Sequence, residues 1–175
     1  KSMAAVSARG LFSGRVLPYT SGMSAPRVDV ISIGRLSRNL LWGEQQRVRT
    51  PHSTCVLVRS GGRNILVDPG LPPAVIAARL YERTGIMPGQ IDTVFLTNFR
   101  PAHRTGLSAF SSAKVLIHEV EREMIRPQLE KMRESVGVDS EDAKVISEDL
   151  ELLESLAEAP DKIATGVDLF PLPGF

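Results

Sequence analysis

The sequence STCVLVRSGGRNILVDPG, residues 53–70, constrains the fold more than any other stretch of the chain. Two runs rich in β-branched residues, 54–59 and 64–67, flank a pair of glycines, and this pattern is typical of a β-hairpin. The second run leads directly into an Asp-Pro-Gly turn that begins at Asp68. We therefore predict an antiparallel hairpin that ends in a turn carrying a carboxylate.

The rest of the chain alternates segments with strand and helix patterns. In chain order we expect a strand at 28–36, a loop or irregular hairpin at 37–52, a helix at 72–85, strands at 91–97 and 113–119, helices within 119–160 that break at Pro127 and near Gly137, and a strand running into a turn at 166–175. Ser140 is the expected N-cap of the last helix. This order indicates an α/β (α+β) fold with some antiparallel pairing.

Composition limits the classes of protein that fit. A chain of 175 residues is long enough for one domain with a real core. Its 21 basic and 20 acidic residues give a net charge of +1, so there is no global electrostatic argument for nucleic acid or a membrane as partner. No apolar run approaches the roughly 20 residues that span a bilayer, and we expect no membrane association. The single cysteine, Cys55, excludes a disulfide within this chain and is expected to be a buried small hydrophobe.

Residues 1–27 differ from the rest because they are basic, rich in serine and free of acids. We expect a flexible basic N-terminal arm, followed by one domain over residues 28–175. Such an arm also suits an organellar transit peptide, and the first residues also suit an expression remnant. The expected location is cytoplasmic, with a mitochondrion or another organelle as the alternative.

The segment TNFRPAHRTG, residues 97–106, follows a buried strand, where enzymes often place ligands and catalytic groups. It contains His103, a lone imidazole that could transfer protons. A hydrogen-bonded structural role for His103 is the simpler interpretation. Asp68 is expected to organise its turn and the neighbouring loop by accepting backbone N–H bonds.

Together, HSTCVLVRSGGRNILVDPG, the following helix and GIMPGQIDTVFLTNFRPAHRTGL resemble the metallo-β-lactamase superfamily. In that family a hairpin ends in Val-Asp-x-Gly, a helix follows, and a Leu-Thr strand leads into His-x-His-x-Asp-His-x-Gly-Gly. The resemblance runs from about Val28 to Leu107 and resumes weakly at PLPGF, where the family has Thr-Pro-Gly-His. It implies an αββα sandwich, of which this chain supplies mainly the N-terminal half. The domain is therefore expected to be incomplete at its C-terminus.

The resemblance also implies a degenerate metal site. The family loop holds one or two zinc ions through imidazoles and a carboxylate. Aligned on this sequence, the two first histidines become Asn98 and Arg100, the aspartate becomes Ala102, the last histidine is His103, and the later histidine falls on Phe175. We expect no cofactor, and zinc only if ligands lie beyond residue 175.

Arg100 places a permanent cation where the family has a metal-binding imidazole. A buried acid that lost its metal would carry uncompensated charge, and a guanidinium could supply the compensation. We predict that Arg100 replaces the metal by pairing with Asp68 or with an acid beyond residue 175.

These residues support three functional hypotheses. The first is a non-catalytic binding or assembly module, derived from a metallohydrolase, with an unknown small-molecule or protein partner. The second is an active hydrolase of an ester, thioester, lactone or phosphoester. Such a hydrolase would use metal ligands from the C-terminal half of the fold, beyond residue 175, or His103 as the base and Arg100 as the group that stabilises the oxyanion. The third is an RNA-associated or ribonucleoprotein component, which only the basic N-terminal arm favours. We also expect a missing C-terminal half or a partner chain to cover the open face of the sheet.

Overall fold

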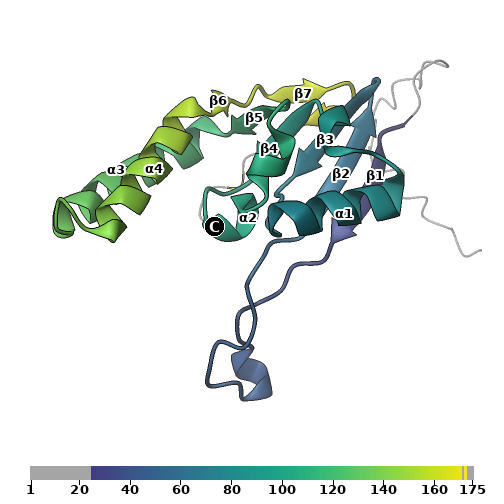
Figure 1. The fold of residues 1–175 in the computed structure, drawn as a ribbon. Coiled ribbons are helices and arrows are strands. Elements are labelled where there is room, and N and C mark those ends of the chain that lie inside the picture. Colours follow the sequence, from purple (N-terminus) through teal and green to yellow (C-terminus); the bar gives the residue numbers. More distant parts are fainter. Residues whose placement is uncertain (1–24, 171, 173–175) are drawn as a thin grey trace, which may run out of the picture.

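The computed structural model describes residues 25–170 and residue 172. Its centre is a six-stranded sheet in which the strands lie side by side in chain order (Figure 1). The strands are β1 (Arg27–Ser32), β2 (Cys55–Ser60), β3 (Arg63–Val67), β4 (Thr93–Leu96), β5 (Lys114–Ile117) and β6 (Ala157–Glu158). The first three strands pair antiparallel, and β3 to β6 pair parallel. The mixed α/β class predicted from the sequence is confirmed.

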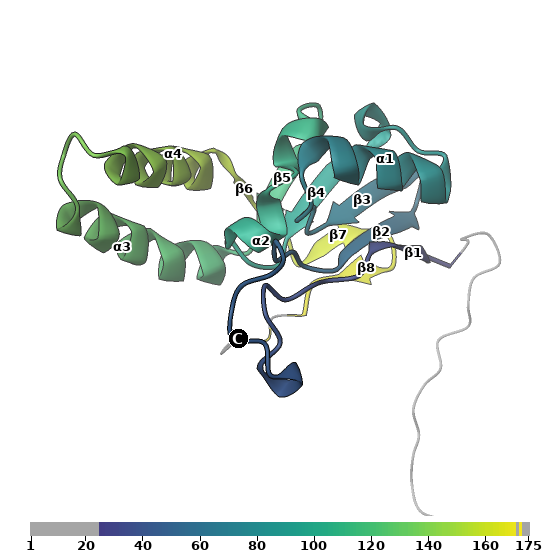
Figure 2. The same ribbon diagram turned by 60° about the horizontal axis from the view of Figure 1, so that its bottom comes forward.

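The helices lie in two groups. The α-helices are α1 (Pro73–Thr84), α2 (Pro101–Arg104), α3 (Glu119–Ser135) and α4 (Glu141–Ser155), and the 3-10 turns are η1 (Leu40–Trp42), η2 (Pro88–Gln90) and η3 (Leu107–Phe110). Helix α1 covers one face of the sheet, whereas α3 and α4 form an antiparallel pair that projects beyond its β6 side (Figures 1 and 2).

The predicted hairpin of β2 and β3 is confirmed. Gly61 and Gly62 connect the strands with φ angles of 58° and 76°, a left-handed pair that glycine adopts without steric cost. The register pairs Leu57 with Leu66, and Leu66 with Val94 on β4. These three side chains are fully buried and belong to the same core cluster as Ile76 and Leu80 of α1. The register of the hairpin and these core contacts thus set the position of the C-terminal end of β3.

The opposite face of the sheet is only partly covered. A small hairpin of β7 (Lys162–Ala164) and β8 (Val167–Asp168) lies on the side away from α1 (Figure 2). Ser60 anchors it by donating to the carbonyl of Thr165. Val28 and Val30 of β1 are 60% and 44% exposed on this face, and their partners on β2 are half-buried. The face keeps an apolar surface on the β1 side.

A projecting loop (residues 35–52) connects β1 to β2 and extends away from the sheet, with η1 at its tip (Figure 1). Arg35 and His52 close its base by exchanging two backbone hydrogen bonds, of 2.8 and 3.1 Å. The predicted strand at 28–36 therefore stops earlier, at Ser32, because the chain leaves the sheet there to enter this loop.

Several boundaries differ from the predicted ones. Pro127 does not break α3, which runs through it to Ser135. Proline removes one N–H donor, and Pro127 lies on an exposed face of the helix where water can satisfy the carbonyl that loses its partner. The helical prediction to residue 160 is also wrong, since α4 ends at Ser155 and β6 follows. Of the predicted strand at 166–175, the described residues form only β8.

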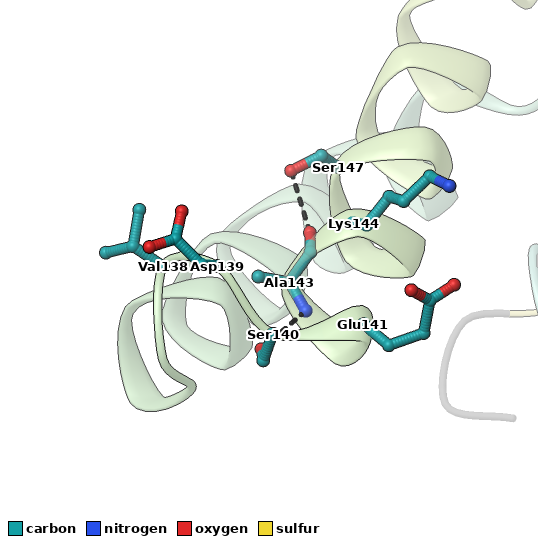
Figure 3. A pocket seen from close by; sticks show the side chains of 7 residues that line it. All are labelled: Val138, Asp139, Ser140, Glu141, Ala143, Lys144 and Ser147. Atoms are coloured by element: carbon teal, nitrogen blue, oxygen red, sulfur yellow. Dashed lines mark hydrogen bonds between the residues drawn. The ribbon is translucent and has the colours of Figure 1, made fainter.

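Ser140 is the N-cap of α4, as predicted, and accepts a hydrogen bond from the N–H of Ala143 at 3.1 Å (Figure 3). Most of the basic N-terminal arm, residues 1–24, and Phe175 lie outside the described residues. Within the part of the chain that the structure describes, no helix is long and apolar enough to cross a membrane.

Candidate functional site

The candidate site lies at the sheet edge where β3 and β4 both end. Because these strands are parallel, their carboxyl ends meet, which is where α/β sheets commonly bind ligands. Asp68 follows β3 directly, and its N–H donates to the carbonyl of Phe95 at 3.1 Å. Thr97 follows β4. The two strand ends therefore present Asp68 and Thr97 side by side.

Asp68 is the centre of a hydrogen-bond network. It is 5% exposed and has a φ of 51°, the left-handed conformation that aspartate tolerates better than most residues. Its Oδ1 accepts from the backbone N–H of Thr97 at 2.8 Å, and its Oδ2 accepts from Oγ1 of Thr97 at 2.5 Å. The prediction that Asp68 organises the neighbouring loop by accepting backbone N–H bonds is confirmed.

His103 completes this network. Its Nδ1 lies 3.0 Å from Oδ2 of Asp68 and 3.4 Å from Oγ1 of Thr97. A carboxylate beside Nδ1 favours the tautomer that carries the proton there, which leaves Nε2 as the acceptor atom of the ring. The His103 side chain is 25% exposed, whereas that of Asp68 is 7% exposed. The arrangement is a histidine oriented by a buried carboxylate.

Two glycines hold the turn of Asp68 against the loop of His103. A Cβ atom on Gly70 would lie 1.8 Å from the carbonyl oxygen of Ala102, so no other residue fits there without moving the backbone. The N–H of Gly106 donates to the carbonyl of Pro69 at 2.8 Å. The carbonyl of Ala102 also accepts from the N–H of Ser53 at 2.9 Å. The loop is thus fixed by backbone contacts as well as by Asp68.

The predicted pairing of Arg100 with Asp68 is wrong. Arg100 is exposed, and no carboxylate among the described residues lies within ion-pair distance of its guanidinium. Its backbone is extended, with φ −58° and ψ 147°, as the following Pro101 favours. Asp68 is already bonded to Thr97 and His103. Pairing of Arg100 with an acid beyond residue 175 stays a prediction.

The other aligned metal-loop positions contribute to the backbone of the loop. Asn98 is half-buried, and its Oδ1 accepts from the N–H of Arg100 at 2.9 Å, which shapes the turn before α2. Ala102 acts through its carbonyl. Sequence reasoning missed Thr97, although its place at the end of β4, beside the carboxylate that follows β3, could have indicated it.

The helical pair is joined to the loop by Phe99 and Arg104. The N–H of Phe99 donates to Oε1 of Glu121 on α3 at 3.0 Å. The Arg104 guanidinium lies 4.4 Å from the centre of the Phe99 ring, donates to the Phe99 carbonyl at 2.6 Å, and bonds Asp149 of α4 at 2.6 Å. Stacking of this partly buried guanidinium on the Phe99 ring adds to the stability of the contact. The helices therefore support the loop.

Zinc, which the family resemblance implies, does not fit the donors in the described part of the chain. No three histidine, cysteine, aspartate or glutamate side chains gather there as a metal would require. His103 and Asp68 bind each other through Nδ1 and Oδ2. Cys55 is fully buried, as predicted, and burial followed by the charge of Asp68 raises the pKa of its thiol to about 12. A neutral buried thiol is a poor ligand.

Two hollows of the described surface lie away from the Asp68–His103 pair. One lies at the turn between α3 and α4 and is lined by polar side chains that include Asp139, Glu141 and Lys144 (Figure 3). The other, of about 570 Å³, lies between η3, β5 and the end of α4, and Lys114 is the charged residue that lines it. Neither hollow is lined by Asp68 or His103.

Comparisons with known proteins concern the fold of the chain. Residues 48–156 match the sequence profile described as the metallo-beta-lactamase superfamily. A metallo-beta-lactamase candidate from Thermotoga maritima is similar in structure, with a TM-score of 0.55 and 19% identity over 79% of this chain and 61% of that chain. AidC, a dizinc quorum-quenching lactonase, has a TM-score of 0.50 and 15% identity over 82% of this chain and 58% of that chain. A comparison with curated proteins found no match.

These two structural neighbours share the fold with this chain at low identity. The chain spans about three fifths of the length of each neighbour, 61% of one and 58% of the other. The αββα expectation is met by the part of the fold that the described residues form, a six-stranded sheet with α1 on one face and the two-stranded sheet of β7 and β8 on the other.

Proposed function

Because the chain belongs to the metallo-β-lactamase superfamily, we propose that it is a non-catalytic member that serves as a binding or assembly module. The observation that carries this proposal is that His103, the one histidine in the aligned loop, is already in contact with a buried carboxylate. His103 is bonded through Nδ1 to Asp68, and Asp68 is bonded to Thr97. The histidine stabilises the loop, so its retention is explained without a metal.

The chemistry of the loop supports the same proposal. A zinc hydrolase needs the ion as Lewis acid and as the source of an activated water. Asn98 is a weak zinc ligand, Ala102 offers no side-chain donor, and the Arg100 guanidinium repels a dication. Loss of three aligned ligands together removes the centre that the reaction needs.

A partner is part of this proposal. The apolar surface around Val28 and Val30, on the face opposite α1, is suited to cover by a protein partner or a further segment of chain. The sheet edge at Thr97 and His103 offers a small molecule a hydroxyl and a ring nitrogen. Both contacts would use the fold as a scaffold and require no bond cleavage.

Metal analysis tests the proposal. The full chain, incubated with excess zinc and then dialysed, should retain far less than one zinc ion per chain, and it should hydrolyse neither a lactone nor a phosphodiester above the buffer rate. One firmly bound zinc per chain that disappears in His103→Ala would overturn the proposal.

A variant that restores ligands sharpens this test. Asn98→His, Arg100→His and Ala102→Asp together return the family ligands to a loop whose backbone is already fixed. This triple variant should gain stoichiometric zinc binding. The matched control places histidines at the exposed and distant positions Gln45 and Gln90, and should not gain it. Failure of both variants to bind would mean that the loop geometry differs from that of the family.

One observation favours a second candidate, a hydrolase that works without metal. The Asp68–His103 contact of 3.0 Å is the geometry of an oriented general base, with Nε2 as the atom that would accept a proton. Arg100 would stabilise the oxyanion. Ester hydrolysis that survives a chelator and is lost in His103→Asn would establish this candidate over the first.

A further inference from the structure

The tip of the projecting loop exposes three large apolar side chains in a single turn. Leu40, Leu41 and Trp42 are 65%, 94% and 75% exposed, and none packs into the described core. They form η1 at the part of the loop farthest from the sheet (Figure 1). We propose that this tip docks the protein on the surface of an anionic lipid membrane, with the three side chains inserted among the headgroups.

The charges around the tip complement an anionic surface. Residues 35–52 contain four arginines and one acid, Glu44. Glu44 is bonded to Arg49 and also accepts from the N–H of Asn39 at 2.6 Å, so its charge is compensated within the loop. Arg35, Arg38 and Arg47 are exposed. Basic side chains flanking leucine and tryptophan form the pattern with which peripheral segments bind anionic lipid.

The tip is organised before it meets a partner. The side chain of Asn39 accepts from the N–H of Leu41 at 3.0 Å and caps the turn at its start. Gly43 ends the turn with a φ of 73°, and its N–H donates to the carbonyl of Leu40 at 3.1 Å. Ordering the tip on a surface therefore costs little entropy. Tryptophan in particular prefers the membrane–water interface.

A second copy of the chain fits the tip less well than lipid does. A protruding apolar tip needs a complementary apolar hollow in a protein partner. The hollow of about 570 Å³ is lined by Leu107, Phe110 and Leu156, but its lining charge is Lys114, which repels arginine. The other hollow, at the α3–α4 turn, is polar. A lipid surface needs no matching hollow, because headgroups move apart around the inserted side chains.

This inference departs from the expectation that net charge argues against a membrane. The charge is unevenly distributed: residues 119–161, which include α3 and α4, contain 14 acids and 5 bases, so the remainder is strongly basic. The loop leaves the sheet at the edge that carries the candidate site, because Ser53, just after the loop, donates from Oγ to the carbonyl of Asp68 at 3.2 Å. Docking would hold that edge close to the membrane.

Trp42 is the only tryptophan of the chain, so its fluorescence reports on the tip directly. The full chain is titrated with vesicles of phosphatidylcholine alone and of phosphatidylcholine mixed with phosphatidylserine. Only the mixed vesicles should shift the emission of Trp42 to the blue and make it sensitive to quenching by brominated lipid. Replacing Arg38 and Arg47 with Gln should weaken vesicle affinity by about fivefold per residue. Leu40→Ser with Leu41→Ser should abolish the shift.

Matched controls use exposed residues of the same chemical kind elsewhere in the chain. Arg63→Gln with Arg79→Gln, and Val138→Ser with Met132→Ser, change exposed arginines and exposed apolar side chains far from the tip and should bind like the parent. Absence of any shift with phosphatidylserine vesicles overturns the proposal. An equal shift with neutral vesicles overturns the role of the arginines. A shift that follows protein concentration without vesicles assigns the tip to contact between copies and also overturns it.

Discussion

Asp68 combines a left-handed backbone with a nearly buried charge, and both features have a local reason. Aspartate tolerates a positive φ because its short side chain can bond neighbouring backbone groups. The N–H and hydroxyl of Thr97 and the Nδ1 of His103 surround the carboxylate and compensate for its loss of water. Asp68 therefore connects the ends of β3 and β4 with the loop that contains α2.

Asp68→Asn should lower the free energy of unfolding by about 1–3 kcal/mol, because an amide offers one acceptor where the carboxylate uses both oxygens. Asparagine keeps the tolerance for positive φ, so the loss reports on the interactions of the carboxylate and not on backbone strain. Urea denaturation measures it. The control is Asp92→Asn, an exposed aspartate whose Oδ2 accepts from the N–H of Asn64 at 2.8 Å. Equal effects in the two variants would contradict the central role of Asp68.

The buried thiol of Cys55 gives a prediction for alkaline pH. Folding raises the pKa of this thiol from its ordinary value of 9.0 to about 12, through burial first and the Asp68 charge second. A raised pKa contributes stability that is complete below pH 9 and is lost as pH rises toward 12. Stability should thus fall over this range, and less steeply in Cys55→Ala. Urea titrations at each pH measure the two slopes, and parallel slopes would refute the assignment.

For single residues, the sequence predicted which residues form the site better than it predicted where their side chains point. The role of Asp68 follows from its place after a strand and before Pro-Gly, which are local features. The pairing of Arg100 with Asp68 required knowing which way Arg100 leaves the backbone, and the extended residue before Pro101 leaves it exposed. The residue that contacts Asp68 is His103 and not Arg100.

The contact between the Asp68 turn and the α2 loop is set by backbone atoms. Gly70→Ala should lower the unfolding free energy by about 3 kcal/mol or more, since the added methyl group would meet the Ala102 carbonyl at 1.8 Å and neither backbone can retreat. Thermal and urea unfolding measure the loss. Gly89→Ala, where a Cβ meets nothing within 4 Å, is the control and should change little. A small effect at Gly70 would show that the loop can slide.

Helices, turns and caps could be predicted from the sequence where their pattern depends on residues that are neighbours in the chain. The glycine hairpin, the helix that ends at Gly85 and the Ser140 cap all depend on neighbouring residues, and all are confirmed. The short strand β6 forms because β5 offers it an edge, which no local pattern reveals. Pro127 misled the prediction because a helix tolerates proline on an exposed face when its packing elsewhere is sufficient.

For the molecule as a whole, the face opposite α1 is the feature with a measurable consequence. Val28→Thr with Val30→Thr should reduce binding of the hydrophobic dye anilinonaphthalene sulfonate, because these exposed valines belong to the uncovered surface. Unfolding free energy should stay within about 0.5 kcal/mol of the parent, since threonine keeps the β-branched shape at an exposed site. Dye fluorescence measures the change. Val138→Thr, at an exposed valine outside the sheet, should leave dye binding unaltered.

The order of the strands also affects how the protein forms. Each strand from β2 to β6 pairs with the strand that precedes it in the chain, so every strand after β1 meets a partner that has already been synthesised. The β2–β3 pair closes over the two glycines, whereas the parallel pairs from β3 to β6 join segments far apart in the chain, and closing these longer loops is the slower part of assembly. The sheet can grow strand by strand in the direction of synthesis, beginning at the glycine hairpin, while the chain is still emerging from the ribosome.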